Sequence, residues 1–143
     1  MTELTQLDDL LDEYTFHPPK SVERYQMLIE LGERLEPMPD VLKTDATKVP
    51  GCASSVWLYP PPSPRQGVLH FLADSNSAFT KGVVALVLAT VQDQPAQKIV
   101  QTDIAELLAP FGLKHDFSPD RTRGVPNMIA KIKETAERLA AAA

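Results

Sequence analysis

Residues 49–57 read VPGCASSVW and place the chain's single cysteine, Cys52, between a Pro-Gly turn and a segment that favours a β-strand. Proline restricts the backbone of the residue before it, and glycine adopts conformations that other residues avoid. This pair predicts a sharp, defined loop, after which a strand begins near Ser55. We therefore expect the loop to present the Cys52 thiol outward on a rigid base.

Two roles for Cys52 follow from its position alone. Free cysteines are among the most buried residue types, which leaves a packing role open. A packing cysteine would more naturally lie within a periodic apolar face, as Val83 does, and the loop position favours chemistry instead. A single cysteine forms no intramolecular disulfide and builds no four-cysteine metal site. Any chemistry of this thiol therefore requires a partner molecule.

The chain before this loop is predicted to be helical. One helix is expected over residues 4–14 and ends before Pro18, and a second begins after Ser21 as N-cap and runs to about Leu35. From Pro37 to Cys52 the pattern indicates a loop. Apolar side chains at helical spacing mark one face of each helix: Leu4, Leu7, Leu10, Leu11 and Tyr14 in the first, and Val22, Tyr25, Leu28, Ile29 and Leu35 in the second.

The chain after the loop is predicted to form a hairpin. Residues 55–59 and 68–73 are rich in strand-favouring side chains, and the run PPPSPRQG at 60–67 separates them. We expect the two strands to pair antiparallel. Asp74 and Ser75 then offer N-cap oxygens for a helix that extends to Val91. Its β-branched content leaves a buried strand as the alternative, but the pattern is longer than a typical strand.

The remaining elements complete an α+β prediction. A short helix is expected over 103–108, and a last helix begins with Pro126 in its first turn, with Ile129, Ile132, Ala136 and Leu139 on one face. Strands in the middle and helices at both ends indicate a small antiparallel sheet of about three strands, packed against N- and C-terminal helices. The length of 143 residues predicts one domain over residues 1–143.

Composition excludes several classes of protein. A net charge of −5 argues against a large phosphate-neutralising surface and thus against nucleic acid as a partner. The longest apolar run, at 82–91, is about half of what a membrane-spanning helix requires. Residues 1–16 carry five acidic side chains and no basic one, which is the wrong charge for a signal peptide. We expect a cytoplasmic protein.

Several blocks of the sequence resemble the SufE family, and together they cover nearly the whole chain. Gly51-Cys52 through Trp57 is the most specific block, since it combines a rare tryptophan with the only cysteine. Thr47 departs from the family, which has asparagine at that position, and the departure concerns hydrogen bonding in the loop. The other matching residues are Tyr25, Leu28, Ile29, Leu31, Gly32, Val49, Asp74, Ser75, Lys81, Gly82, Arg121, Gly124, Met128 and Ile129.

The resemblance implies a SufE/IscU-like fold and a sulfur carrier that needs no cofactor or metal of its own. Cys52 would accept sulfane sulfur from a SufS-type cysteine desulfurase, as a persulfide, and stimulate that enzyme. A SufBCD-type scaffold would then take the sulfur for iron–sulfur cluster assembly. The chain would act as a sulfurtransferase-like carrier and not as a stand-alone enzyme.

Reactivity of the thiol requires a stabilised thiolate. Arg121, Lys48 and Lys81 are the candidate cations, and the resemblance marks Arg121 as the second site residue, orienting the loop or the persulfide. An arginine in solvent or paired with an acidic residue is the alternative for Arg121. Asp74 and Ser75 are interpreted as a helix cap, and Trp57 as core.

Other functions remain open on the sequence alone. The same fold could activate a desulfurase without carrying sulfur, or belong to the related CsdE branch that serves another desulfurase. An iron–sulfur scaffold would need several thiolate ligands, and a one-cysteine peroxidase would need an external resolving thiol. The three histidines, His17, His70 and His115, lack metal-ligand spacing with Cys52.

Overall fold

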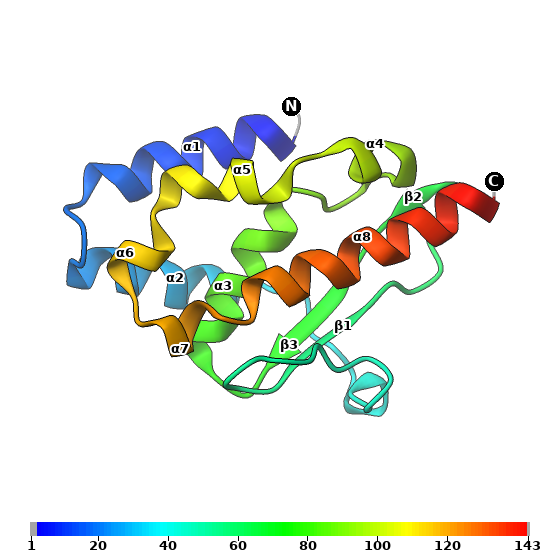
Figure 1. The fold of residues 1–143 in the computed structure, drawn as a ribbon, viewed down its shortest axis with the longest axis horizontal. Helices are drawn as coiled ribbons and strands as arrows, with labels where there is room; N and C mark the ends of the chain where they lie inside the picture. The colour runs from blue at the N-terminus through cyan, green and yellow to red at the C-terminus, as the bar shows by residue number, and fades with distance from the viewer. Residues whose placement is uncertain (1–2, 143) are drawn as a thin grey trace.

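The computed structural model describes residues 3–142 and confirms the α+β class (Figure 1). The predicted domain limits at residues 1 and 143, and the side chain of Leu4, lie outside the described residues. In chain order the elements are α1 Glu3–Phe16, α2 Val22–Glu33, η1 Asp40–Leu42, β1 Val56–Tyr59, β2 Val68–Leu69, β3 Leu72–Ser75, α3 Ala78–Ala89, β4 Gln94–Pro95, α4 Ala96–Gln101, α5 Ile104–Leu108, η2 Ala109–Phe111, α6 Leu113–Asp116, α7 Pro119–Thr122 and α8 Val125–Ala142.

The strands form two short antiparallel pairs in place of one hairpin. β1 pairs with β3, with Val56 opposite Ser75, and β2 pairs with β4. The predicted strand 68–73 is therefore divided after Leu69. The cause is Gln92, whose side-chain oxygen accepts from the Phe71 backbone N–H at 2.7 Å, while its amide nitrogen donates to the Phe71 carbonyl at 2.8 Å. With both groups satisfied by a side chain, Phe71 leaves the ladder.

Helix α3 confirms the helical interpretation of residues 75–91, although its start differs from the prediction. Asp74 and Ser75 lie in β3 and do not cap the helix. Ser77 is the N-cap, and its hydroxyl accepts from the Thr80 N–H at 3.2 Å. The β-branched residues of α3 are tolerated because the helix is buried on nearly every side.

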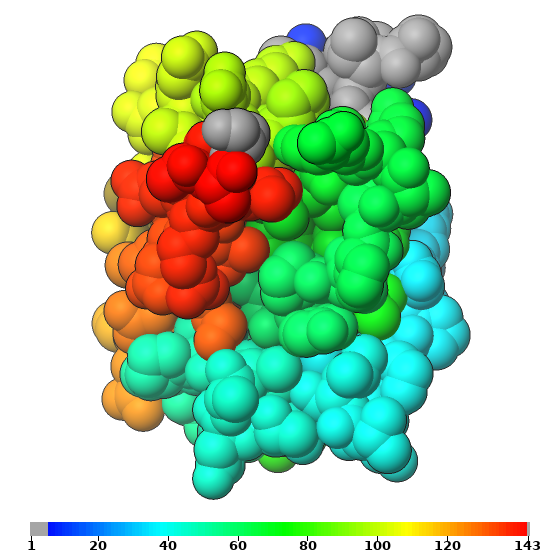
Figure 2. Space-filling model, turned by 90° about the vertical axis from the view of Figure 1, so that its right-hand side faces the viewer, coloured from blue at the N-terminus to red at the C-terminus, as the bar shows by residue number. Residues whose placement is uncertain are grey.

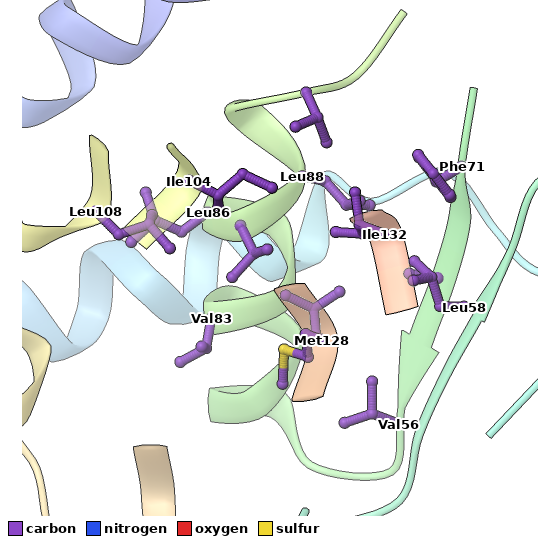
Figure 3. Close-up of a cluster of buried hydrophobic side chains, with 14 of the residues drawn as sticks. Val56, Leu58, Phe71, Val83, Leu86, Leu88, Ile104, Leu108, Met128 and Ile132 are labelled. Carbon is purple, nitrogen blue, oxygen red and sulfur yellow. The ribbon is translucent and has the colours of Figure 1, made fainter. Parts of the chain in front are cut away.

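The hydrophobic core surrounds α3 (Figure 3). Side chains from β1, from Phe71 just before β3 and from α8 meet one side of this helix, and those of α5 meet another. On a further side α2 crosses α3 closely, at Gly32 and Gly82. The labelled core residues are Val56, Leu58, Phe71, Val83, Leu86, Leu88, Ile104, Leu108, Met128 and Ile132.

Helix α2 begins as predicted, with the Ser21 hydroxyl accepting from the Arg24 N–H at 3.2 Å. The predicted apolar face is wrong at Val22, which is 78% exposed, whereas Arg24 is buried. The Arg24 guanidinium donates to the carbonyls of Tyr14 and His17 and pairs with Asp116 at 2.8 Å. A buried arginine requires such partners, and these contacts tie α1, α2 and α6 together.

His70 joins two distant loops through carboxylates. Its ring nitrogens lie 2.8 Å from Glu36 and 2.8 Å from Asp93. Burial opposes protonation of the ring, but the hydrogen bonds with Asp93 and Glu36 outweigh it and raise the pKa of His70. A raised pKa in the folded state gives stability that is present below the ordinary histidine pKa and is lost as pH rises through the folded value.

We predict that His70→Asn removes a pH-dependent part of the stability, amounting to less than about 1 kcal/mol because the carboxylates are exposed. Urea unfolding at about pH 6 and at about pH 8.5 measures it. The wild type should lose more stability between the two conditions than the variant does. His115→Gln, at an exposed position of α6, serves as the control. Equal pH dependence in wild type and His70→Asn would contradict the prediction.

Candidate functional site

The loop before Cys52 is fixed at its base by the first strand. The Val49 N–H donates to the Val56 carbonyl at 2.8 Å, and the Leu58 N–H donates to the Thr47 carbonyl at 2.8 Å. The Thr47 hydroxyl accepts from the Thr44 N–H at 3.0 Å and donates to the Leu42 carbonyl at 2.6 Å. Threonine therefore supplies the hydrogen bonds of the loop at the position where the sequence departs from the family pattern.

The tip of the loop depends on Gly51 and on helix α8. Gly51 has φ +78°, a conformation that favours glycine. The Asn127 side-chain amide donates to the Pro50 carbonyl at 2.8 Å. The same amide nitrogen occupies the space where a Cβ on residue 51 would lie. The predicted sharp loop is thus observed, and α8 covers it.

The Cys52 thiol is half-buried and does not point freely outward as expected. Its sulfur lies against the backbone of Gly124, where a Cβ would overlap Sγ and approach the Cys52 Cβ to 3.1 Å. The thiol donates a long hydrogen bond to the Pro50 carbonyl, with 4.0 Å between Sγ and the oxygen. A side chain at residue 124 would displace the thiol.

Burial raises the pKa of Cys52, and the positive charge of Arg123 opposes that shift. The resting thiol is therefore mainly protonated at neutral pH. The cation that acts on Cys52 is Arg123, which the sequence analysis did not single out. The Lys81 ammonium pairs with Asp74 at 3.4 Å, and the backbone of Lys48 forms an isolated β-bridge with that of Trp57.

Arg121 stacks on aromatic rings. Its guanidinium carbon lies 5.0 Å from the Phe79 ring centre and 5.6 Å from that of Tyr25. Those two rings are themselves stacked at 5.5 Å. Arg121 is exposed, which agrees with the alternative of an arginine in solvent, and its expected role in orienting the loop or the persulfide stays a prediction. Its stacking joins α7 to α2 and α3, three residues before Gly124.

Asp74 holds two lysines beside the first strand. Its carboxylate pairs with Lys43 at 2.5 Å and with Lys81 at 3.4 Å. Burial works against the carboxylate charge, yet the hydrogen bond from Lys43 and the nearby charges lower the pKa of Asp74. Trp57, expected in the core, is only half-buried, and Lys43 lies 5.9 Å from its ring centre.

The Cys52 loop lies at the surface of the protein, with its thiol half-buried. A groove between the proline-rich segment 60–69 and the end of α8 does not include Cys52 (Figure 2). Within residues 3–142, no group of three or more histidine, cysteine and acidic side chains could hold a metal ion. No helix in the described part of the chain is long and apolar enough to cross a membrane. A protein partner suits such a surface better than an enclosed ligand does.

Sequence reasoning missed Arg123 and Asn127. Both flank Gly124 at the start of α8, and Gly124 itself entered only through the family resemblance. Asn127 left a weak signal, since it is a short amide in the first turn of a helix that already begins with Pro126. Its contact with Pro50 spans 77 residues of sequence, which no local pattern reveals.

Fold and site together define a small α+β protein that carries one thiol on an ordered surface loop. A family model described as "SufE: Fe-S metabolism associated domain" matches residues 9–136, and the chain belongs to the SufE family. The family links it to iron–sulfur metabolism.

Similar proteins agree with this assignment. An uncharacterized SufE-like protein of Rhizobium etli is 36% identical over 141 residues, covering 97% of this chain and 95% of that protein. Another from Rhizobium meliloti is 35% identical over 136 residues, covering 94% and 96%. The solution structure of a hypothetical protein from Thermus thermophilus superposes with a TM-score of 0.73 at 16% identity, over 99% of each chain, which supports the fold alone.

Proposed function

We propose that this protein accepts sulfane sulfur on Cys52 from a SufS-type cysteine desulfurase and delivers it for iron–sulfur cluster assembly. The observation that carries the proposal is the placement of the only thiol on an ordered surface loop, in a chain of the SufE family. A SufBCD-type scaffold is the proposed acceptor. These partners also imply a cytoplasmic location.

The proposed transfer is a thiol–persulfide exchange. The Cys52 thiolate attacks the outer sulfur of the desulfurase persulfide, a sulfur–sulfur bond forms, and the bond within the donor persulfide breaks. The desulfurase cysteine leaves as a thiolate and takes up a proton, while Cys52 becomes a persulfide. Delivery repeats the exchange, with an acceptor cysteine attacking the terminal sulfur. No oxidant or reductant is consumed.

The resting site holds Cys52 back from this reaction. The attacking group must be a thiolate, whereas burial raises the pKa of Cys52 in the free protein. Docking therefore has to move the loop away from Gly124 or bring further positive charge to the sulfur. Arg123 already provides part of that charge, and Arg121 fixes the segment that carries it.

Intact-mass measurement tests the proposal. The protein is incubated with a SufS-type desulfurase, pyridoxal phosphate and cysteine, and its mass is recorded without reductant. We expect the addition of one sulfur atom, reversed by a thiol reductant and absent from Cys52→Ser. Faster alanine production without any adduct would instead show an activator that does not carry sulfur. If a CsdE-type desulfurase charges Cys52 and a SufS-type enzyme does not, the partner assignment is wrong.

A further inference from the structure

The cysteine loop lies along one face of helix α8. Gly124, directly before the helix, and two residues of the helix contact three positions of the loop in opposite order. Gly124 packs on Cys52, the Asn127 amide donates to the Pro50 carbonyl, and the Lys131 ammonium donates to the Ala46 carbonyl at 3.2 Å. Residues 124, 127 and 131 share one helical face because of their spacing. The loop is thus held along a rigid element of the core.

Asn127 is the central contact of this series, between Gly124 and Lys131. It bonds the carbonyl of Pro50, two residues before Cys52, and its amide covers Gly51. The same Pro50 carbonyl is the acceptor that lies 4.0 Å from Sγ. If Cys52 leaves Gly124 by a shift of the loop tip, that shift breaks the Asn127 hydrogen bond.

We infer that Asn127 is a positioning residue that holds the Cys52 loop against α8 and thereby limits the reactivity of the thiol in the free protein. Its role in sulfur transfer rests on the proposed function. Its effect on thiol reactivity does not, because that effect is a property of the free chain. A partner that displaces the Asn127 amide from Pro50 would release the cysteine.

The effect follows from one hydrogen bond. A typical intramolecular hydrogen bond contributes a modest net stabilisation, so its loss should raise the population of the open loop about threefold to tenfold. Alkylation by iodoacetamide samples the open, ionised thiol. Since burial is what raises the pKa of Cys52, the released thiol should also ionise at lower pH.

The experiment compares alkylation rates of the free protein over a range of pH. Asn127→Ala should react about threefold to tenfold faster than the wild type at neutral pH, with its pH profile moved to lower pH. Asn127→Asp keeps the size of the side chain and sets a carboxylate oxygen against the Pro50 carbonyl. At neutral pH it should react faster than the wild type but more slowly than Asn127→Ala, because its negative charge opposes ionisation of the thiol. It provides a second test if the alanine variant does not fold.

Lys133→Met is the matched control. Lys133 lies on the same helix and donates to the carbonyls of Ile99, Val100 and Thr102, on the α4–α5 side. Its loss should lower stability without changing the alkylation rate or its pH profile, measured well below the melting temperature. A general loosening of α8 would instead accelerate all three variants, and that result would overturn the inference.

Wild-type rates in both Asn127 variants would also overturn the inference, whatever the outcome of the persulfide assay. The carrier function can also fail while the positioning role of Asn127 is supported. Faster alkylation of Asn127→Ala, together with no sulfur adduct on the wild type, would support the positioning role and reject the carrier function. The two proposals therefore fail on different measurements.

Discussion

Gly124→Ala should make the Cys52 thiol roughly 5- to 100-fold more reactive in the free protein. An added methyl group at residue 124 would overlap Sγ and lie 3.2 Å from the Cys52 Cα. Overpacking of this kind costs about 1–3 kcal/mol, and each 1.4 kcal/mol is a factor of ten in the open population. The loop gives way because it is partly exposed, whereas Gly124 is buried directly before α8.

Alkylation with iodoacetamide measures this effect, with melting temperature recorded in parallel. Gly67→Ala is the control, because a methyl group there meets nothing within 4 Å while φ of +78° makes it strained. That variant should lose about 1 kcal/mol of stability and leave the Cys52 rate unchanged. A wild-type rate in folded Gly124→Ala would show that α8, and not the loop, absorbs the overlap.

The elements with strong local signals were predicted from the sequence. The Ser21 cap and the following prolines predicted the limits of α2. For α3, the length of the apolar pattern favoured a helix over a buried strand. The Pro-Gly pair predicted the sharp turn before Cys52, which Gly51 forms with positive φ. Local propensity determines these features, so a single sequence is sufficient to find them.

The predictions that were wrong concern features that depend on contacts between residues far apart in the sequence. Gln92 divides the predicted strand 68–73 through hydrogen bonds to Phe71, 21 residues away. Arg24 is buried because Asp116 reaches it across 92 residues. No periodicity reports such pairings, and burial of an arginine contradicts the usual preference for the surface.

In the site, too, local sequence predicts some features and long-range contacts determine the others. Sequence indicated Cys52 and its loop, but the surroundings of the thiol come from the segment 123–131, whose role is set by packing. Arg121 matched the family pattern and stacks on Tyr25 and Phe79, while Arg123 supplies the charge near the sulfur. The family motif identifies residues of the site, whereas the contacts of each residue follow from the folded structure.

Gly82→Ala should destabilise the protein by about 3 kcal/mol and lower its melting temperature by roughly 5–10 °C. A Cβ on Gly82 would overlap the Leu28 carbonyl oxygen and lie 2.5 Å from the carbonyl carbon. That neighbour is backbone, so no side chain can rotate away. The opposing Gly32 meets the same limit, since its Cβ would lie 2.6 Å from the Gly82 nitrogen. Urea and thermal unfolding measure the loss.

The sign of the stability change in Gly82→Ala distinguishes steric overlap between the helices, which destabilises, from helix propensity, which stabilises. In an exposed helix interior, alanine in place of glycine stabilises by about 1 kcal/mol, so a stabilised Gly82→Ala would show that α2 and α3 do not touch there. The crossing also holds Tyr25 of α2 against Phe79 of α3, on which Arg121 rests. Separation of the two helices should therefore loosen the segment that leads to Gly124 and accelerate Cys52 alkylation, whereas Gly67→Ala should do neither.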